Sequence, residues 1–183
     1  IRLLPLCMSL MIMRMIANVN RYAYLLGACN SVLYAVVYFS LTLYSSAAYS
    51  LLVSSPMTFM TFLNWNKKKQ GGSTQLKRLT NMQRVFVAIA CIIGWGLLYV
   101  VFNPQGSQYI LLDNAVSVLG ITTSVLAMLR YREYGVLSIM NYCAGVILYI
   151  CMLPDNPGQI TYLIYSLYTV CCAITTTINL RKM

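Results

Sequence analysis

The chain has 183 residues, of which 60% are hydrophobic and only 9% are charged, whereas an ordinary soluble domain is about 45 to 50% apolar and about a quarter charged. This composition excludes a water-soluble fold, because too few polar side chains are available to cover a surface that faces water. Thirteen Lys and Arg stand against three acidic residues, and there is no His. Most routes to acid–base catalysis and to hard-metal binding are therefore absent, and neither an enzyme, a metal site nor a cofactor is expected.

The net charge of +10 does not indicate a nucleic-acid partner, which requires a basic face on a soluble module. The basic residues fall in short gaps between apolar runs, a pattern typical of topology signals and of contacts with an anionic lipid bilayer. The seven cysteines lie inside apolar runs and form no C-x-x-C pair, so they are interpreted as small, buried, reduced packing residues. Because the sequence begins at Ile1 without a Met, the natural amino end is not established and no signal peptide can be judged.

Seven apolar runs follow one another along the chain, and a membrane-spanning helix needs about 20 mostly apolar residues. The runs cover Leu3–Ile16, Tyr22–Leu43, Ala47–Leu63, Val85–Phe102, Tyr109–Leu129, Gly135–Leu153 and Ile160–Ile178. The sequence therefore predicts an all-α membrane protein with seven transmembrane helices. We expect a first three-helix bundle (1–63), a basic cytoplasmic loop (64–84), a linker helix (85–102) and a second three-helix bundle (109–183).

The gaps between the runs alternate in charge. With Arg14 near the inner end of the first run, twelve of the thirteen basic residues fall on one side of the membrane, and only Arg2 lies on the other. The positive-inside rule then places the amino end outside and the carboxyl end in the cytoplasm.

The second triplet of helices begins four spans after the first, so the two triplets must point the same way across the membrane. A constant offset in residue number, 141 − 30 = 111, aligns Arg21 with Arg132, Leu26 with Leu137, Asn30 with Asn141 and Tyr38 with Tyr149. A further shift of two aligns Asn66 with Asn179. A parallel repeat of this kind is known in transporters.

Asn30 and Asn141 lie well inside apolar spans, where an amide needs hydrogen-bond partners. Tyr34 and Tyr38 lie four and eight residues after Asn30, on nearly the same helix face. On the second helix, Tyr149 likewise lies eight residues after Asn141. Both helices are thus able to present an amide and a ring to a common binding site. The alternative is that each Asn only bonds a neighbouring helix, which contributes about 0.6 to 2 kcal/mol.

Other residues have two interpretations each. Tyr165 is either a substrate contact or, like Tyr162, part of the interfacial aromatic belt. Trp95, between two glycines, is a packing residue or a stacking surface, whereas Trp65, close to Lys67, is interpreted as an anchor at the membrane interface. Pro56 inside the third span is a kink or a hinge.

No Asp, Glu, Lys or His lies at the centre of any span, and no phosphate-binding glycine motif appears. The sequence therefore contains no evident proton relay, no carboxylate for sodium and no ATP-hydrolysing loop. Passive transport is expected.

Two stretches resemble the PnuC family of vitamin transporters, whose typical member takes up nicotinamide riboside. In the second half the resemblance rests on Leu111–Asn141, with Asp113, Arg130-Tyr131, Glu133 and Asn141 at the family's positions. In the first half it rests on Leu26-Gly27, Asn30, Leu33-Tyr34-Ala35, Pro56-Met57 and Asn64-Trp65.

The resemblance implies a seven-helix core of two three-helix bundles joined by a linker helix, similar to the SWEET sugar carriers. It also implies facilitated diffusion across a bacterial inner membrane, with the vitamin trapped afterwards by a cytoplasmic kinase, and it leaves a homo-oligomer open. Thr58 stands where many relatives have Gln after Pro-Met and joins Asn30, Tyr34, Tyr38, Asn141, Tyr149 and Tyr165 as expected substrate contacts.

Where many carriers of nicotinamide riboside have tryptophans around the sixth-helix Asn, this chain has Tyr134, Gly135 and Ser138. Thiamine or riboflavin therefore remains an alternative substrate. A structural or regulatory membrane subunit remains a second alternative; it would pack its amides helix to helix and leave no cavity.

Overall fold

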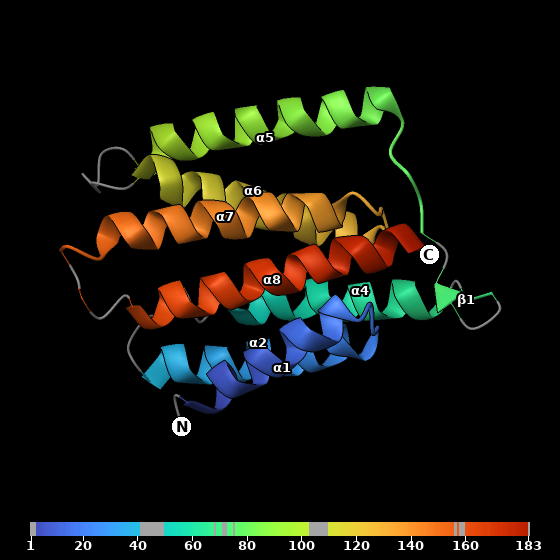
Figure 1. Ribbon diagram of the computed structural model, residues 1–183, viewed down its shortest axis with the longest axis horizontal. Coiled ribbons are helices and arrows are strands. Elements are labelled where there is room, and N and C mark those ends of the chain that lie inside the picture. Colours follow the sequence, from blue (N-terminus) through green and yellow to red (C-terminus); the bar gives the residue numbers. More distant parts are fainter. Residues whose placement is uncertain are drawn as a thin grey trace.

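The computed structural model describes residues 3–40, 50–67, 69–70, 73–74, 76–102, 110–155, 157 and 160–182. Its helices are α1 (Leu3–Ala17), α2 (Tyr22–Ser40), the π-helical turn η1 (Ser50–Ser54), α4 (Ser55–Lys67), α5 (Asn81–Phe102), α6 (Ile110–Met128), α7 (Tyr134–Met152) and α8 (Ile160–Lys182). The strands found in these residues are the antiparallel pair β1 (Lys69–Gln70) and β2 (Ser73–Thr74). Apart from this short strand pair, the predicted all-α fold with seven helices is confirmed (Figure 1).

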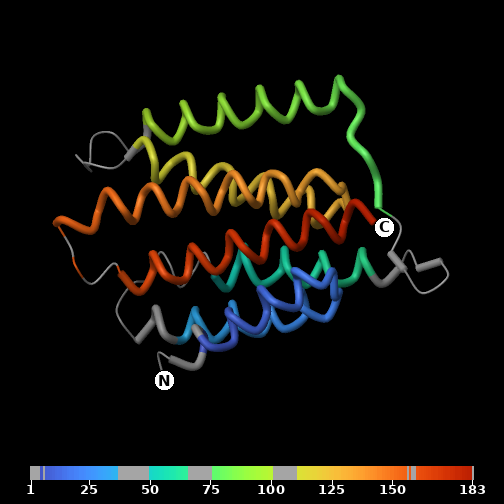
Figure 2. The backbone as a smooth tube through the Cα atoms, in the orientation of Figure 1, coloured from blue at the N-terminus to red at the C-terminus, as the bar shows by residue number. Residues whose placement is uncertain are grey.

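Six of the helices form a closed ring in which each helix packs against the next, in the order α1, α2, α4, α6, α7, α8 and back to α1. The seventh, α5, packs on α6 and lies along one side of the molecule (Figures 1 and 2). The two halves of the ring have equivalent contacts: α1 packs on α2 as α6 packs on α7, and α2 packs on α4 as α7 packs on α8. The two halves meet through the equivalent pairs α4–α6 and α8–α1. This arrangement is consistent with two parallel three-helix bundles joined by α5.

The turns after α1 and after α6 have the same backbone structure. Val19 and Arg130 both adopt the left-handed conformation, with φ of 54° and 64°. Each follows its helix as the left-handed residue of a Schellman motif. The backbone N–H of the next residue closes the motif: Asn20 donates to Met15 O and Tyr131 to Leu126 O, both at 2.9 Å. Because 130 − 19 = 111, the turns repeat at the offset that the sequence predicts.

The third helices of the two bundles are also equivalent, but at a different offset. Asn64 Nδ2 donates to Met128 O at 3.1 Å, and Asn179 Nδ2 donates to Ala17 O at 2.7 Å. Since 128 − 17 = 111 and 179 − 64 = 115, the predicted offset of 113, which aligned Asn66 with Asn179, is wrong. The third helix of the second bundle is therefore displaced by 115 − 111 = 4 residues along the chain relative to that of the first bundle. Four residues are close to one helical turn, so the same face of the helix meets the other bundle.

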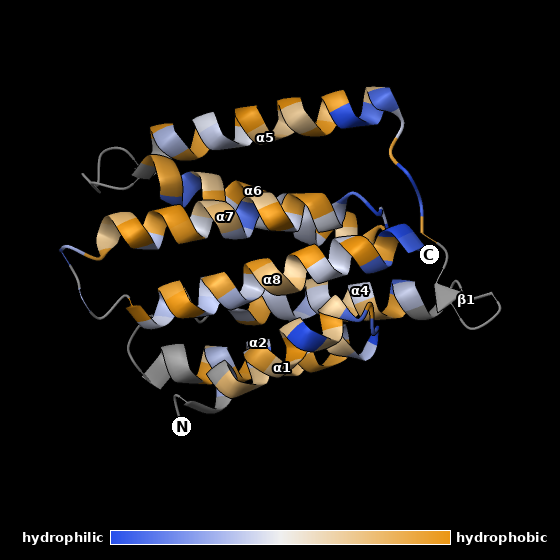
Figure 3. Cartoon of the chain, viewed as in Figure 1, coloured by the Kyte–Doolittle hydropathy of each residue, from blue (hydrophilic) through white to orange (hydrophobic). Residues whose placement is uncertain are grey.

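The segments rich in basic residues gather at one end of the molecule (Figure 3). Lys77 N donates to Arg130 O at 2.8 Å, and Arg132 N donates to Lys77 O at 3.0 Å, so the loop before α5 lies against the α6–α7 turn. Thr80 and Gln83 form a reciprocal capping box that starts α5. The three-dimensional arrangement therefore has the charge asymmetry that the sequence predicts.

Apolar side chains cover much of the outer surface, as expected where lipid replaces water. Four helices, α5 to α8, contain spans long and apolar enough to cross a membrane, while α1 and α2 are shorter apolar helices within the described residues. The residues of α5 are exposed or half-buried along the part of the helix whose burial is described. The chain is a multi-pass membrane protein.

Two sequence predictions are modified by these helices. Six of the seven cysteines are exposed or half-buried, and only Cys172 is buried, so most face outward rather than into the core. Pro56 lies in the first turn of α4, directly after η1. Since proline has no N–H to donate to the preceding turn, the chain changes here from π-helix to α-helix.

Candidate functional site

A cavity of about 330 Å³ lies inside the helix ring, between the first bundle and helices α6 and α7. Its wall is rich in hydroxyl and aromatic groups. The residues that line it are Ser9, Ile12, Met13, Ile16, Ala23, Tyr24, Gly27, Asn30, Ser31, Tyr34, Ser54, Met57, Thr58, Thr61, Thr123, Ser124, Ala127, Tyr134, Ser138 and Tyr142. The volume falls in the range of small-molecule binding sites, about 300 to 1,000 Å³.

Asn30 is the most firmly positioned polar residue of the cavity. Its Nδ2 donates to Ser9 Oγ at 2.9 Å and to Pro5 O at 3.2 Å, so both amide hydrogens are used. Ser9 Oγ in turn donates to Pro5 O and lies 3.2 Å from the hydroxyl of Tyr34. This network orients the amide and leaves Asn30 Oδ1 as a buried acceptor without a partner in the described part of the chain.

Three more lining residues carry a buried polar atom that has no hydrogen-bond partner within the described residues: Thr123 Oγ1 and the hydroxyls of Tyr24 and Tyr134. Tyr24 and Tyr134 are close enough to interact electrostatically, but no well-formed hydrogen bond joins their hydroxyls. A buried polar atom without a partner costs roughly 1 to 3 kcal/mol. Residues that carry such atoms gather around one cavity, which favours a site for a polar ligand.

The face of α4 and η1 adds hydroxyl groups whose hydrogens are already engaged. Thr58 Oγ1 lies 2.8 Å from Ser54 O, and Thr61 Oγ1 donates to Met57 O at 2.8 Å. Ser31 Oγ and Ser54 Oγ are 3.0 Å apart and connect α2 to the π-helical turn. These oxygens are therefore acceptors rather than donors toward the cavity.

The cavity is closed at the basic end by a cluster that we call the plug. It consists of Tyr24, Trp65, Leu79, Leu126, Ala127, Tyr134 and Leu180. The Trp65 ring lies 5.2 Å from that of Tyr24 and 6.1 Å from that of Tyr134, between the two bundles. The side chains of both bundles thus block the route from the cavity to the basic end.

Trp65 lies within the plug with an exposed fraction of 0%, so its predicted role as an interface anchor is wrong. Its Nε1–H donates to Ala127 O at 2.7 Å, which fixes the ring against α6. The carbonyl lies at the end of α6, where it also accepts the Arg130 backbone N–H at 3.1 Å. Trp65 thus contacts the other bundle, and not the membrane interface that the nearby Lys67 suggested.

No Asp, Glu, Lys or Arg is among the described residues that line the cavity. In the described ranges, no group of three or more His, Cys, Asp or Glu side chains is positioned to hold a metal ion. The site has the chemistry of a neutral, aromatic, hydroxyl-rich pocket.

The structure brings three of the seven predicted contact residues to the cavity wall: Asn30, Tyr34 and Thr58. Tyr165 lies close to Ser9, Tyr34 and Tyr142 without lining the cavity itself. The side chain of Tyr38 lies outside the described residues.

Asn141 and Tyr149 are not among the lining residues. A Cβ atom added to Gly120 would lie 3.5 Å from Asn141 Nδ2, so the amide packs against α6, and its Oδ1 is buried without a partner in the described ranges. Tyr149 stacks on Tyr162, with centroids 5.8 Å apart and ring planes 22° apart. Their roles as substrate contacts stay predictions.

Sequence reasoning missed Tyr142, Tyr24 and several serines of the wall. One signal was available: Tyr134, Ser138 and Tyr142 recur every four residues and share a face of α7, with Tyr142 next to Asn141 in the chain. Trp95 is far from this face, on α5, and its Nε1–H donates to Leu111 O at 3.0 Å, as a packing residue would.

Comparison with known proteins agrees with this arrangement. The family model described as "Nicotinamide mononucleotide transporter" matches residues 1–179. The nicotinamide riboside transporter PnuC of Neisseria mucosa is 33% identical over 123 residues, which are 64% of this chain and 47%, about half, of that relative. A crystal structure of the vitamin B3 transporter PnuC has a TM-score of 0.75 at 25% identity and covers 96% of this chain and 77% of that one. The chain belongs to the nicotinamide mononucleotide transporter family.

Proposed function

We propose that the chain carries a vitamin B3 nucleoside, nicotinamide riboside, across the membrane by facilitated diffusion. The observation that carries this proposal is the cavity wall with its four unpartnered buried polar atoms, all within the described residues. A carboxamide and ribose hydroxyls supply both donors and acceptors, so a nucleoside satisfies Asn30 Oδ1 and the hydroxyls of Thr123, Tyr24 and Tyr134 when it binds.

The absence of charged side chains from the described wall favours the nucleoside over the mononucleotide. A phosphate group carries between one and two negative charges near neutral pH, and burial of an unpaired charge costs several kcal/mol. Among the described residues, no Lys or Arg lines the cavity to compensate this charge. The pyridinium ring of nicotinamide riboside is a cation, which the faces of Tyr24, Tyr34, Tyr134 or Tyr142 attract without a carboxylate.

Transport through this site is passive and alternates between the two ends of the cavity. The described wall contains no acidic residue to bind a coupling proton or sodium ion. The plug closes the basic end, and the positive-inside rule makes that end cytoplasmic and the amino end outside. We expect the membrane to be a bacterial inner membrane, as the family resemblance implies. Release to the cytoplasm requires the two bundles to separate at Trp65, after which a kinase traps the vitamin as its phosphate.

The structural-subunit alternative expects no cavity and separately packed amides. Asn141 does pack against a neighbouring helix, but Asn30 lines a cavity, and this difference favours a transporter. Thiamine is the stronger competing substrate because it also carries a cationic ring, whereas the larger flavin ring of riboflavin needs more room.

The test is a thermal-shift titration of the purified chain with nicotinamide riboside, its mononucleotide, thiamine and riboflavin. Ligand at 100 times its dissociation constant stabilises the folded state by about 2.7 kcal/mol. Nicotinamide riboside should stabilise the protein at concentrations at which the mononucleotide does not. Stabilisation by thiamine alone would reassign the substrate, and equal effects of nucleoside and nucleotide would contradict the argument from charge.

A second measurement separates binding from transport. Proteoliposomes that hold the chain should equilibrate labelled nicotinamide riboside without a proton or sodium gradient, and should accumulate it only when a kinase and ATP are enclosed. Uphill accumulation driven by an imposed ion gradient alone would overturn passive transport. Cysteines introduced by Pro154→Cys and Lys182→Cys, in a background without the native cysteines, report orientation: an impermeant reagent should label only the first in intact cells.

A further inference from the structure

A second hollow of the molecule, of about 290 Å³, lies at the basic end beside the plug, with which it shares Leu180. Its wall comes from the segment before α5, from α5, from the α6–α7 turn, from the start of α7 and from α8. Four arginines line it: Arg78, Arg84, Arg132 and Arg181. We call it the arginine pocket.

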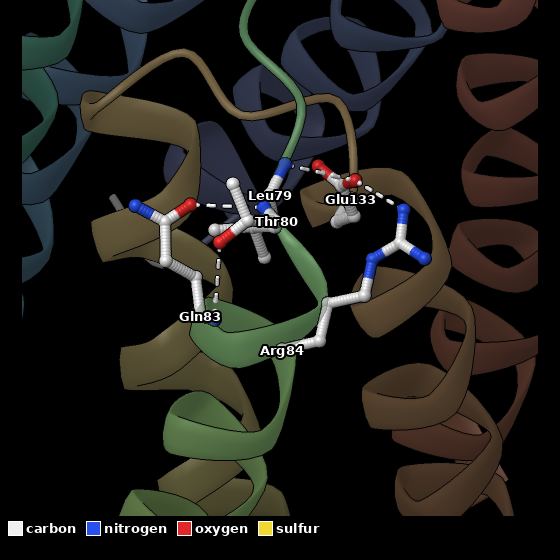
Figure 4. Close-up of polar contacts among 5 residues, drawn as sticks. All are labelled: Leu79, Thr80, Gln83, Arg84 and Glu133. Carbon is white, nitrogen blue, oxygen red and sulfur yellow. Dashed lines mark hydrogen bonds and ion pairs between the residues drawn. The ribbon is translucent and has the colours of Figure 1, made fainter.

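The arginine pocket carries an uncompensated positive charge. Its one acid among the described residues is Glu133, whose Oε1 lies 3.2 Å from Arg84 Nη2 and accepts the Leu79 backbone N–H at 3.1 Å (Figure 4). The other two acids of the chain, Asp113 and Asp155, lie at the start of α6 and just after α7, at the opposite end (Figure 1). Four guanidinium groups and one carboxylate leave a net charge of 4 − 1 = +3.

Hydrogen bonds join the segments that carry three of the arginines. Arg132 N donates to Lys77 O at 3.0 Å, which joins the segment of Arg78 to the turn that carries Arg132. Glu133 then ties this turn to the start of α5 through Leu79 and Arg84. Arg181 comes from the last turn of α8. Arginine side chains from four segments thus line one hollow that is open to solvent: Arg78, Arg84 and Arg181 are exposed, and Arg132 is half-buried.

We propose that the arginine pocket binds a phosphate group, either in the headgroup of an anionic lipid or in a soluble phosphate compound. Guanidinium groups match phosphate oxygens in bidentate geometry, and several arginines are able to bind one phosphate at once because each of its oxygens accepts separately. The position at the end of apolar helices suits a lipid headgroup, and the hollow itself suits a free anion. This site is separate from the cavity, whose described wall holds no arginine.

The test measures thermal unfolding of the purified full chain in two arms. One arm titrates inorganic phosphate against chloride at matched ionic strength. The other compares nanodiscs of phosphatidylcholine with and without phosphatidylglycerol. The test variant is Arg132→Gln/Arg181→Gln, and the matched control is Lys77→Gln/Lys182→Gln, which removes the same charge from the same end without touching the pocket wall.

We expect stabilisation in at least one arm, and a 10-fold to 100-fold weaker affinity in the arginine variant, since each bond to a charged group contributes strongly. A response to phosphatidylglycerol alone supports a lipid headgroup, and a response to inorganic phosphate supports a soluble anion. Absence of a response in both arms, or an equal loss in the lysine control, overturns the proposal. Should the double variant fail to fold, Arg181→Gln, exposed on the last turn of α8, is measured instead.

Discussion

The two three-helix bundles have the same backbone plan but different side chains on the faces that meet. On α2 the small residues Ala23, Gly27 and Ser31 line the cavity. Their counterparts on α7, at the offset of 111, are Tyr134, Ser138 and Tyr142. Small side chains leave room in the first bundle, and two tyrosines occupy the equivalent space in the second.

The two repeat-related asparagines differ as a result. Asn30 lines the cavity and bonds Ser9, whereas Asn141 packs against Gly120, the residue at the position of Ser9 since 120 − 9 = 111. Equivalent positions in a repeat therefore do not imply equivalent surroundings. The residue that faces each amide, Ser9 or Gly120, differs between the two bundles.

The largest expected loss of stability comes from a substitution at the contact between α7 and α8. A Cβ atom added to Gly135 would lie 2.8 Å from Thr177 Oγ1 and 3.2 Å from its Cα, closer than side chains tolerate, whereas its counterpart in the first bundle is the large Tyr24. Gly135→Leu should destabilise the fold by about 3 kcal/mol, at the upper end of the cost of overpacking. Thermal unfolding in detergent measures this effect.

The control for this prediction is Gly96→Leu on α5. No described atom lies within 4 Å of an added Cβ there, and leucine is the better helix former. The variant should unfold at the parent temperature or slightly above it. Equal losses in both variants would show that close packing does not distinguish α7–α8 from α5.

Binding should distinguish the two asparagines. Asn30→Ala removes the acceptor Oδ1 and the bonds to Ser9 and Pro5, so nicotinamide riboside should bind about 5-fold to 150-fold more weakly, from a loss of roughly 1 to 3 kcal/mol. Asn141→Ala should cost less, because that side chain does not line the cavity. Calorimetric titration of both folded variants decides whether Asn141, too, contacts the ligand.

The sequence predicts the helices, the repeat and the charge asymmetry well, because each rests on a pattern of many residues. The apolar runs define the spans, since their lengths approach the thickness of a bilayer. The offset of 111 recurs in the turns at Val19 and Arg130. Polar residues inside apolar helices are also conspicuous, so Asn30 is recognised as a candidate.

The environment of single side chains is not predictable in the same way. Trp65 resembles an interface anchor by its place beside lysines, yet it is buried because α6 of the other bundle covers it. Asn141 and Tyr142 are adjacent in sequence, but about 100° of helix rotation directs only Tyr142 to the cavity. Which face meets the cavity depends on how the two bundles dock, and that is a long-range property.

A substitution in the plug should cause a smaller loss of stability. Trp65→Phe removes the bond to Ala127 O, which then accepts only the Arg130 N–H, so the folded, plug-closed state should lose about 1 kcal/mol. Leu180, the counterpart of Trp65 since 180 − 65 = 115, has no polar atom in its side chain, and Leu180→Met should cost less because it conserves volume. Thermal unfolding and thiol labelling of Ser138→Cys from the basic end measure stability and opening. Unchanged labelling in Trp65→Phe would show that this bond does not keep the end closed.

The smallest effect is expected at the start of α7, where the bundles also differ. Glu133 pairs with Arg84, whereas its counterpart in the first bundle, Tyr22 (133 − 22 = 111), lies under Arg21 at 4.9 Å from the ring centroid. The Arg84 side chain is 55% exposed, so water screens the ion pair, and Arg84→Gln should cost less than about 1 kcal/mol and still less at high salt. Glu133→Gln should cost more, since Glu133 is only 19% exposed and also accepts the Leu79 N–H. A double-mutant cycle at two salt concentrations isolates the pair. A coupling energy well above about 1 kcal/mol, the upper end for exposed pairs, or one that salt leaves unchanged, would show that the pair behaves as a buried one.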